Sequence, residues 1–173
     1  AKENYWSNYN GTDTNKDGIG DIPYRIGDIV QDKCPLMGVF YDFNTSLGYR
    51  VNVISNSTIE DFEYFESNST IKMHVSNMTT SQTYGFCRIC IPHTLMNETY
   101  HVTIDGAEPY YVNYALYHNG THRWIYFSYK HSTLEIVIVQ EFLSLIILPL
   151  FMIATLLAVI VYRRNILHNR MQT

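Results

Sequence analysis

The chain has 173 residues and a formal net charge of −4 at pH 7, enough for one ordinary domain and an additional element. Residues 1–141 carry nine Lys and Arg against sixteen Asp and Glu, whereas residues 142–173 carry three Arg and no acidic residue. An acidic body argues against nucleic-acid binding, because a face that meets phosphates has to be basic. The chain begins AKENYW, without an initiator Met or an apolar leader. We therefore expect it to be the C-terminal part of a longer exported protein.

Residues 11–21, GTDTNKDGIGD, place oxygen-bearing side chains at alternate positions. Five residues fall where a calcium loop has its ligands, at positions one, three, five, seven and nine: Asp13, Asn15, Asp17, Ile19 (through its carbonyl) and Asp21. Gly18 permits the sharp turn at position six, but Tyr24 replaces the bidentate Glu of position twelve. We expect a weak structural calcium site, with a dissociation constant of about 10⁻⁴ to 10⁻³ M. The alternative is an Asx-rich turn whose side chains bond their own backbone.

Short motifs recur in a fixed order in the first 37 residues: Asn4-Tyr5-Trp6-Ser7, Asp17-Gly18-Ile19-Gly20-Asp21, Pro23-Tyr24 and Pro35-Leu36-Met37. Together they resemble the closing segment of NosD-like right-handed parallel β-helix proteins. The resemblance implies that residues 1–38 end a β-helix and that the Asp-rich loop is a structural calcium clip. Residues 49–164 are similar to the C-terminal region of archaeal cell-surface proteins that carry such β-helices, through GFCRICIP, FSYKHST and the apolar run after Glu141.

Between residues 39 and 140, short β-type runs are separated by turn residues, as in all-β sandwiches. Eight strands are predicted: YRVNVIS (49–55), IEDFEYF (59–65), STIKMHVS (69–76), YGFCRICIP (84–92), TYHVTI (99–104), YYVNYALYH (110–118), HRWIYFSY (122–129) and STLEIVIVQ (132–140). Asp105-Gly106 and Asn119-Gly120 suit two-residue type I′ hairpins, which need positive φ at both central residues. We expect an Ig-like antiparallel β-sandwich.

Two residue pairs have metal-type or redox-type spacing. Cys87 and Cys90 form a CxxC sequence within a predicted strand, where residues three apart face opposite sides and lie about 10 Å apart. That separation is too large for a disulfide, so burial of at least one thiol is expected; Cys34 is the third cysteine. His118 and His122 have the spacing of zinc ligands on a helix. A two-residue hairpin would place the two imidazoles on opposite faces, which argues against zinc.

Catalytic signatures are absent from the sequence, which contains no GxSxG, no HExxH and no Gly-rich phosphate loop. His93 follows Cys90 closely, but no third group is present to orient a base, so a non-catalytic role is favoured. The 15 tyrosines could line a carbohydrate-binding face, although aromatic residues more often pack as cross-strand pairs.

Residues 142–162, FLSLIILPLFMIATLLAVIVY, form an uncharged apolar run. As a helix it would be about 31 Å long, which matches the hydrocarbon core of a bilayer. Arg163, Arg164 and Arg170 follow it, and positive residues stay on the cytoplasmic side. The sequence therefore predicts a single-pass anchor in the cell membrane, with the N-terminal part extracellular and the tail cytoplasmic.

Seven glycosylation sequons support the same orientation, whereas chance placement predicts about two. They are Asn10, Asn44, Asn56, Asn68, Asn77, Asn97 and Asn119. None lies in the predicted anchor or tail. We expect several of them to carry glycans.

These expectations combine into a mainly β fold with four parts. Residues 1–38 would end a parallel β-helix, 39–140 would form the sandwich, 141–164 a transmembrane α-helix and 165–173 a cytoplasmic tail. The expected function is that of a non-catalytic, membrane-anchored envelope or adhesion protein, with the sandwich as its stalk. The expected partners are the lipid bilayer and envelope proteins or surface glycans, with no nucleic acid; calcium is the one expected cofactor. The alternative is the membrane tether of an upstream β-helix carbohydrate-active enzyme, a lyase or hydrolase.

Overall fold

The structure is a computed structural model that describes residues 4–96, 99–141 and 147–170. The chain divides into two compact units, Ala1–Gln140 and Glu141–Thr173. The first unit is built from strands, and the second contains the helix α1 (Ile147–Arg170). In chain order the strands are β1 (Asn4–Tyr5), β2 (Tyr24–Ile26), β3 (Val30–Asp32), β4 (Pro35–Leu36), β5 (Val39–Asn44), β6 (Arg50–Ser55), β7 (Ser57–Phe65), β8 (Thr70–Asn77), β9 (Tyr84–Pro92), β10 (Tyr100–Ile104), β11 (Tyr111–His118), β12 (His122–Lys130) and β13 (Leu134–Gln140).

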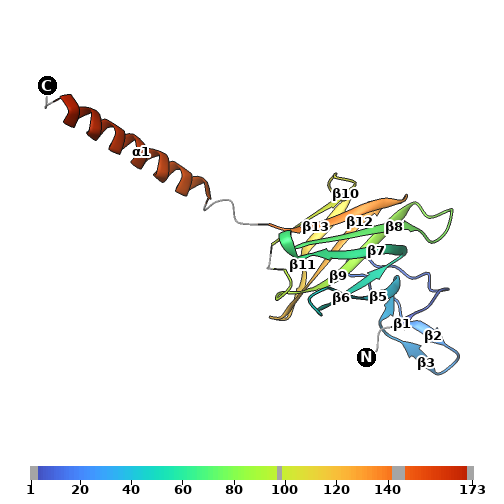
Figure 1. The fold of residues 1–173 in the computed structure, drawn as a ribbon. Helices are drawn as coiled ribbons and strands as arrows, with labels where there is room; N and C mark the ends of the chain where they lie inside the picture. Colours follow the sequence, from blue (N-terminus) through green and yellow to red (C-terminus); the bar gives the residue numbers. More distant parts are fainter. Residues whose placement is uncertain (1–3, 97–98, 142–146, 171–173) are drawn as a thin grey trace. The chain divides into compact units, whose positions relative to one another are not determined.

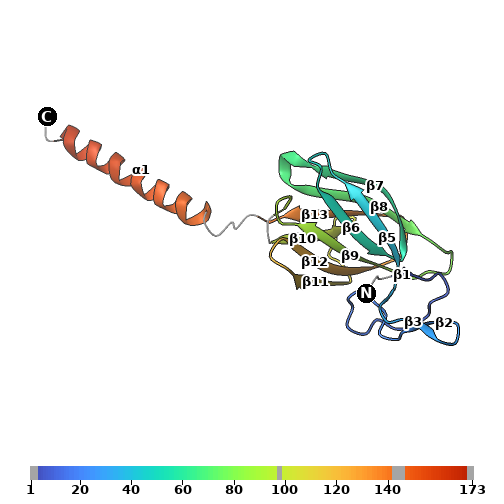
Figure 2. The same ribbon diagram turned by 90° about the horizontal axis from the view of Figure 1, so that it is seen from below.

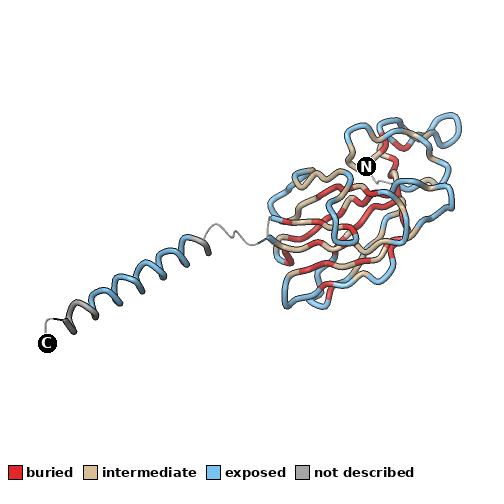
Figure 3. The backbone as a smooth tube through the Cα atoms, turned by 90° about the horizontal axis from the view of Figure 1, so that it is seen from above, coloured by how far each residue is buried: buried red, intermediate tan, exposed pale blue. Residues whose placement is uncertain are grey.

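Two antiparallel sheets form the body of the first unit (Figure 1). One has five strands in the order β11-β12-β9-β6-β5, and the other has four in the order β10-β13-β8-β7. Apolar residues alternate along these strands, so each sheet turns one apolar face toward the other. The resulting core lies between the sheets, where the buried segments gather in Figure 3. Phe127, Ile89, Ile71 and Ile138 are among its fully buried members.

All eight predicted strands are strands in the structure, and β9 has the predicted bounds. β5 was not predicted; it is an edge strand of the five-stranded sheet. The Asp105-Gly106 turn forms, since both residues have positive φ and Ile104 and Ala107 exchange backbone hydrogen bonds. The predicted hairpin does not follow from it, because β10 pairs with β13 and β11 pairs with β12.

The second predicted hairpin is wrong in register. His118 pairs with Arg123, and Tyr117 pairs with Trp124, so Asn119 faces His122 and the turn is centred on Gly120-Thr121. The side chain of Asn119 explains the shifted turn, because its Oδ1 accepts hydrogen bonds from the backbone N–H groups of Thr121 and His122. Such an Asx-type bond favours Asn119 at the start of the turn instead of in its middle.

The N-terminal segment, residues 4–38, is not the end of a parallel β-helix, which corrects the predicted fold. Its only parallel pairing within the described chain joins two residues of β1 to two residues of β4. β2 and β3 instead form a short antiparallel hairpin. Stacked β-helix coils need parallel ladders on successive turns, whereas this segment packs as loops against one face of the sandwich (Figure 2).

The predicted transmembrane helix also requires correction. Across residues 4–96, 99–141 and 147–170, no helix is both long and apolar enough to cross a membrane. Helix α1 begins at Ile147, and the first five residues of the predicted span, 142–146, lie outside the described residues. The single-pass topology and the cell-membrane location inferred from that span are overturned with it.

Candidate functional site

The outward side of the five-stranded sheet, called here the outer face, carries the candidate site. In β9, Cys87 and Ile89 point into the core, and the alternate residues Arg88 and Cys90 therefore point outward. The same alternation in the neighbouring strands completes the face. Its residues include Phe40, Asp42, Asn52, Ile54, Phe86, Arg88, Cys90, Tyr117, Trp124 and Tyr126.

Strand register arranges these side chains in two rows that cross the sheet. The first row runs Asp42, Asn52, Cys90, Trp124 and Tyr117, each opposite the next on the neighbouring strand. The second row runs Phe40, Ile54, Arg88 and Tyr126. Residues that stand opposite one another in this way lie about 4.5–5.5 Å apart. The first row is therefore a continuous strip with polar groups at one end and aromatic rings at the other.

A hollow of about 240 Å³ opens on the outer face between these rows. It is lined by Phe40, Asn52, Ile54, Arg88, Cys90 and Trp124. The cause of the hollow is a difference in side-chain size, because Cys90 is short and stands between the larger Asn52 and Trp124 in the first row. The thiol of Cys90 thus contributes to the floor of the hollow, and the larger neighbours form its walls.

The aromatic end of the first row is held by ring contacts. The Trp124 indole lies 5.1 Å from the Tyr117 ring, centroid to centroid, and 6.0 Å from the His122 ring. Tyr117 is 57 % exposed, and Phe40 of the second row, on the opposite edge strand β5, is 51 % exposed. Exposed aromatic rings fixed by their neighbours provide apolar contact area at low entropic cost.

The polar end of the first row is fixed by hydrogen bonds to one carboxylate. Arg50 donates from Nε to Oδ1 of Asp42 at 2.8 Å and from its terminal nitrogen to Oδ2. Asn52 donates from Nδ2 to Oδ1 of Asp42 at 3.0 Å. The hydrogen bond from Arg50 lowers the pKa of Asp42 below its ordinary value. With Nδ2 engaged by Asp42, the Asn52 amide is held in one orientation at the edge of the hollow.

The Asp-rich loop, residues 13–21, lies on the outer face beside this hollow. A Cβ atom built on Gly18 would stand 3.2 Å from Cβ of Arg88 and 3.5 Å from the Phe86 ring, so the loop backbone touches the sheet there. The Lys16 ammonium lies 3.8 Å from the centroid of the Tyr111 ring, a cation–π contact. Ile19 joins Phe86 and Tyr126 in a small apolar cluster. The loop therefore covers the part of the face around Phe86 and Tyr126 and touches Arg88, which lines the hollow.

The predicted calcium ligands of this loop are engaged in hydrogen bonds within it. Asp13 accepts from the backbone N–H groups of Asp17 and Gly18, and Asp17 accepts from the N–H of Ile19 and from the Asn15 amide. Burial raises the pKa of Asp13, although those backbone bonds act in the opposite direction.

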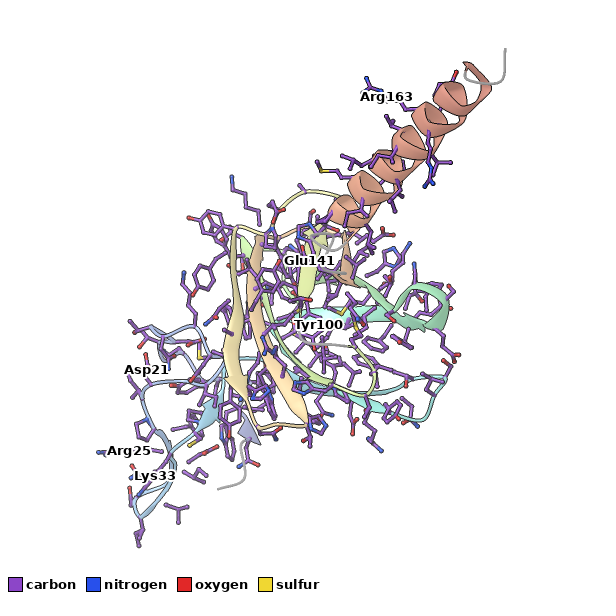
Figure 4. The ribbon with its side chains drawn as sticks, turned by 90° about the vertical axis from the view of Figure 1, so that its left-hand side faces the viewer. Asp21, Arg25, Lys33, Tyr100, Glu141 and Arg163 are labelled. Atoms are coloured by element: carbon purple, nitrogen blue, oxygen red, sulfur yellow. The ribbon has the colours of Figure 1, made fainter. Side chains whose placement is uncertain are left out.

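Asp21 accepts from the N–H of Thr14. It lies with Arg25 and Lys33 on the N-terminal segment, away from the core residue Tyr100 (Figure 4). Among the residues that the structure describes, no three His, Cys, Asp or Glu side chains are grouped to hold a metal ion. The bonds fit the Asx-turn alternative, and calcium coordination by these residues stays a prediction.

The motifs that suggested the NosD-like resemblance contact one another. Trp6 donates from its indole nitrogen to Oδ2 of Asp32 at 2.9 Å and stacks on Tyr24 with centroids 4.7 Å apart. The N–H of Cys34 donates to Oδ1 of Asp32 at 3.0 Å. Burial of Asp32 raises its pKa, but the hydrogen bonds from Trp6, Cys34 and Asn4 outweigh burial, and the pKa is lowered overall. These residues hold the N-terminal segment together.

Nucleophile-type side chains occur in a buried polar cluster between the sheets. The Ser57 hydroxyl lies 2.8 Å from the Tyr129 hydroxyl and 2.8 Å from Nε2 of His131. Ser57 is fully buried, so its serine–histidine contact is closed to a substrate. Burial raises the pKa values of Cys87 and Cys90 to about 11, which keeps both thiols protonated at neutral pH. The hydrogen bonds among Ser57, Tyr129 and His131 satisfy polar groups that are buried between the sheets, as folded proteins require.

This cluster predicts a pH dependence of stability. Burial lowers the pKa of His131 below its ordinary value of 6.5, so the unfolded chain binds the proton more tightly than the folded chain. The contribution of neutral His131 to the free energy of unfolding is fully present above pH 6.5, and it is lost as the pH falls through the folded-state pKa. Thermal unfolding of the wild type should shift to lower temperature between about pH 7.5 and pH 5. His131→Gln should show a smaller shift, and equal shifts in the two proteins would contradict the role of His131.

Five of the predicted glycosylation sites are exposed: Asn10, Asn44, Asn68, Asn77 and Asn119. Asn97 lies outside the described residues. Asn56 is partly buried, and its side chain bonds to the backbone of β9, accepting from the N–H of Phe86 at 2.9 Å and donating to the carbonyl of Tyr84 at 3.1 Å. Asn56 therefore has a structural role that the sequon pattern did not indicate.

Cys87 and Cys90 lie on opposite faces of the sheet, as predicted, and so do His118 and His122. Cys87 is in the core and Cys90 is on the outer face, and both are free thiols. His122 lies beside Trp124 on the outer face, whereas His118 lies 4.9 Å from His93, ring centroid to ring centroid. The zinc interpretation of the His118 and His122 spacing has no geometric support.

Sequence reasoning missed the row that contains Asn52, Cys90 and Trp124. Alternation within each strand could have placed each of them on an outward side. Their juxtaposition depends on the pairing of β6, β9 and β12, which single-strand patterns do not contain. Comparison with family models, curated proteins and solved structures gave no match for the chain.

Proposed function

We propose that residues 4–140 act as a non-catalytic adhesion module that binds its partner through the outer face of the five-stranded sheet. The observation that carries the proposal is the first row of that face. It combines exposed aromatic rings with polar groups held in place by hydrogen bonds, beside an open hollow. Ligand sites combine apolar and aromatic walls with a few fixed polar groups in this way.

The position of the reactive side chains supports a non-catalytic role. Ser57 and Cys87 are fully buried, and the raised pKa of the Cys90 thiol disfavours the nucleophilic thiolate. The polar groups beside the hollow are an amide, a guanidinium and a carboxylate already paired with Arg50. Such groups position a ligand by hydrogen bonding.

A bead-adhesion experiment tests this proposal. Beads that carry the full chain are placed under flow on surfaces coated with xylan, with mannan or with gelatin, and their retention is measured. Phe40→Ala/Trp124→Ala removes aromatic area from the outer face and should reduce retention at least about tenfold on any surface that retains the wild type.

The matched control is Phe65→Ala/Met78→Ala, which removes two apolar side chains outside the outer face, both 36 % exposed. This control should retain beads as the wild type does. Equal retention of the wild type and the outer-face variant, or no retention of the wild type on any surface, would overturn the proposal. Release of new reducing ends or unsaturated sugars from xylan or mannan would replace it with a catalytic function.

A further inference from the structure

We propose that the hollow between Asn52 and Trp124 binds one uncharged pyranose unit of a polysaccharide. This inference rests on the proposed adhesion function and specifies the ligand of the same site. The sugar would lie over Cys90, with one C–H face toward the aromatic side and its hydroxyl groups toward the polar side.

The aromatic side matches the apolar face of a pyranose. Trp124 lines the hollow and is held by Tyr117 and His122, while Phe40 and Ile54 add apolar contact from the second row. The axial C–H groups of a sugar ring form a flat apolar patch, and indole rings offer the largest flat apolar surface among side chains. A ring fixed in advance loses little entropy when the sugar stacks on it.

The polar side matches the hydroxyl groups of the same ring. Asn52 uses Nδ2 to donate to Asp42, so its Oδ1 is oriented and can accept a hydrogen bond from a sugar hydroxyl. Arg88 lines the hollow with a planar group that donates hydrogen bonds. Vicinal hydroxyls present a donor and an acceptor side by side, which is the pattern that planar amide and guanidinium groups bind.

The spacing of the strands fits one ring. Asn52, Cys90 and Trp124 stand on three neighbouring strands, and neighbouring strands lie about 4.8 Å apart. The backbones that carry Asn52 and Trp124 are therefore about 10 Å apart, with the short Cys90 side chain between them. This gap admits a six-membered ring with its substituents.

Two features favour an uncharged saccharide over a charged one or a folded protein. Asp42 is neutralised by Arg50, and the positive Arg88 is next to the loop that carries Asp13 and Asp17, so charges of both signs surround the hollow. The Asp-rich loop also covers the part of the outer face around Phe86 and Tyr126. The loop thereby removes part of this face from contact, whereas a stable protein interface needs about 800 Å² from each partner.

Titration calorimetry of the full chain with cellohexaose, xylohexaose, mannohexaose and hexagalacturonate tests the inference. At least one of the three neutral hexasaccharides should bind more tightly than hexagalacturonate. Trp124→Ala should weaken that binding about tenfold or more, and Trp124→Phe should weaken it less. Cys90→Leu fills the hollow and should abolish binding, whereas the matched Cys90→Ser variant leaves it open and should bind within about twofold of the wild type. Equal melting temperatures show that the variants remain folded.

Absence of binding to all three neutral sugars, tighter binding of hexagalacturonate, or full binding by Cys90→Leu would overturn the inference. The two experiments distinguish failure of the sugar-binding inference from failure of the proposed adhesion function. If no hexasaccharide binds but retention on gelatin still depends on Phe40 and Trp124, the sugar site is wrong and the adhesion surface stands. If retention is independent of these two residues, the adhesion function is wrong as well.

Discussion

Gly38→Ala is expected to lower the free energy of unfolding by about 3 kcal/mol, because overpacking of this kind forces the backbone to move. A Cβ atom on Gly38 would lie 2.2 Å from the carbonyl carbon of Ser55, 2.3 Å from its oxygen and 2.6 Å from the backbone nitrogen of Asn56. These are main-chain atoms at the junction of β6 and β7, and they cannot turn aside as a side chain can. The added methyl group therefore has to separate the N-terminal segment from the sandwich or distort that junction.

Urea unfolding of the wild type and the variant measures this effect. The matched control is Gly48→Ala, where nothing lies within 4 Å of the added Cβ atom and φ is +80°. The cost at Gly48 is limited to the left-handed backbone conformation, about 1 kcal/mol. A Gly38→Ala variant as stable as Gly48→Ala would show that the close contact at Gly38 relaxes freely.

Asp32→Ala should release the N-terminal segment while leaving the sandwich folded. The change leaves the Trp6 indole, the Cys34 N–H and the Asn4 amide without their shared carboxylate. Hydrogen bonds to a charged group contribute about 1.5–3 kcal/mol each, and Asp32 is only 8 % exposed. The short pairings of β1 with β4 and of β2 with β3 offer little to replace them.

Hydrogen exchange followed by mass spectrometry distinguishes the two parts. Amides of residues 4–37 should exchange at least about a hundredfold faster in Asp32→Ala, and amides of β9 and β12 should exchange at the wild-type rate. Asp28→Ala removes an exposed carboxylate of the same segment and should change neither rate. Faster exchange throughout the sandwich would show that the segment and the sandwich unfold as one unit.

The strands of the sandwich could be predicted because each one contains its own signal. β10 and β13 alternate apolar and polar residues, and the buried positions Val102, Ile104, Ile136 and Ile138 follow that alternation. β9 could be predicted from its β-branched and aromatic residues and from the turn residues around it. β5, with the sequence VFYDFN, escaped prediction because an edge strand with a charged residue lacks a long apolar run.

The N-terminal segment could not be predicted from its motifs alone. The Asp-rich loop has the residue spacing of a calcium loop, but spacing does not reveal that backbone N–H groups of Asp17, Gly18 and Ile19 bond to its carboxylates. The Trp6 and Asp32 contact joins residues 26 positions apart. Contacts of this range depend on the path of the chain, which neither periodicity nor composition determines.

The first row of the outer face could be predicted only in part. A carbohydrate-binding face was one of two uses considered for the aromatic residues, and packing as cross-strand pairs was the favoured one. The place of Cys90 between Asn52 and Trp124 required the register of three strands that are distant in sequence. The same holds for Asn56, because its sequon can be read from the sequence but the hydrogen bonds from its side chain to the backbone of β9 cannot.

The three cysteines lie at three different depths, and together they form a set of internal reporters of opening. Cys34 is partly exposed in the N-terminal segment, Cys90 lies beneath the hollow, and Cys87 is sealed between the sheets. A thiol-modifying reagent meets Cys34 at the surface and Cys90 through the hollow, but it reaches Cys87 only when the two sheets have separated. The rate at which Cys87 becomes modified, relative to the other two thiols, would therefore record how often the core opens.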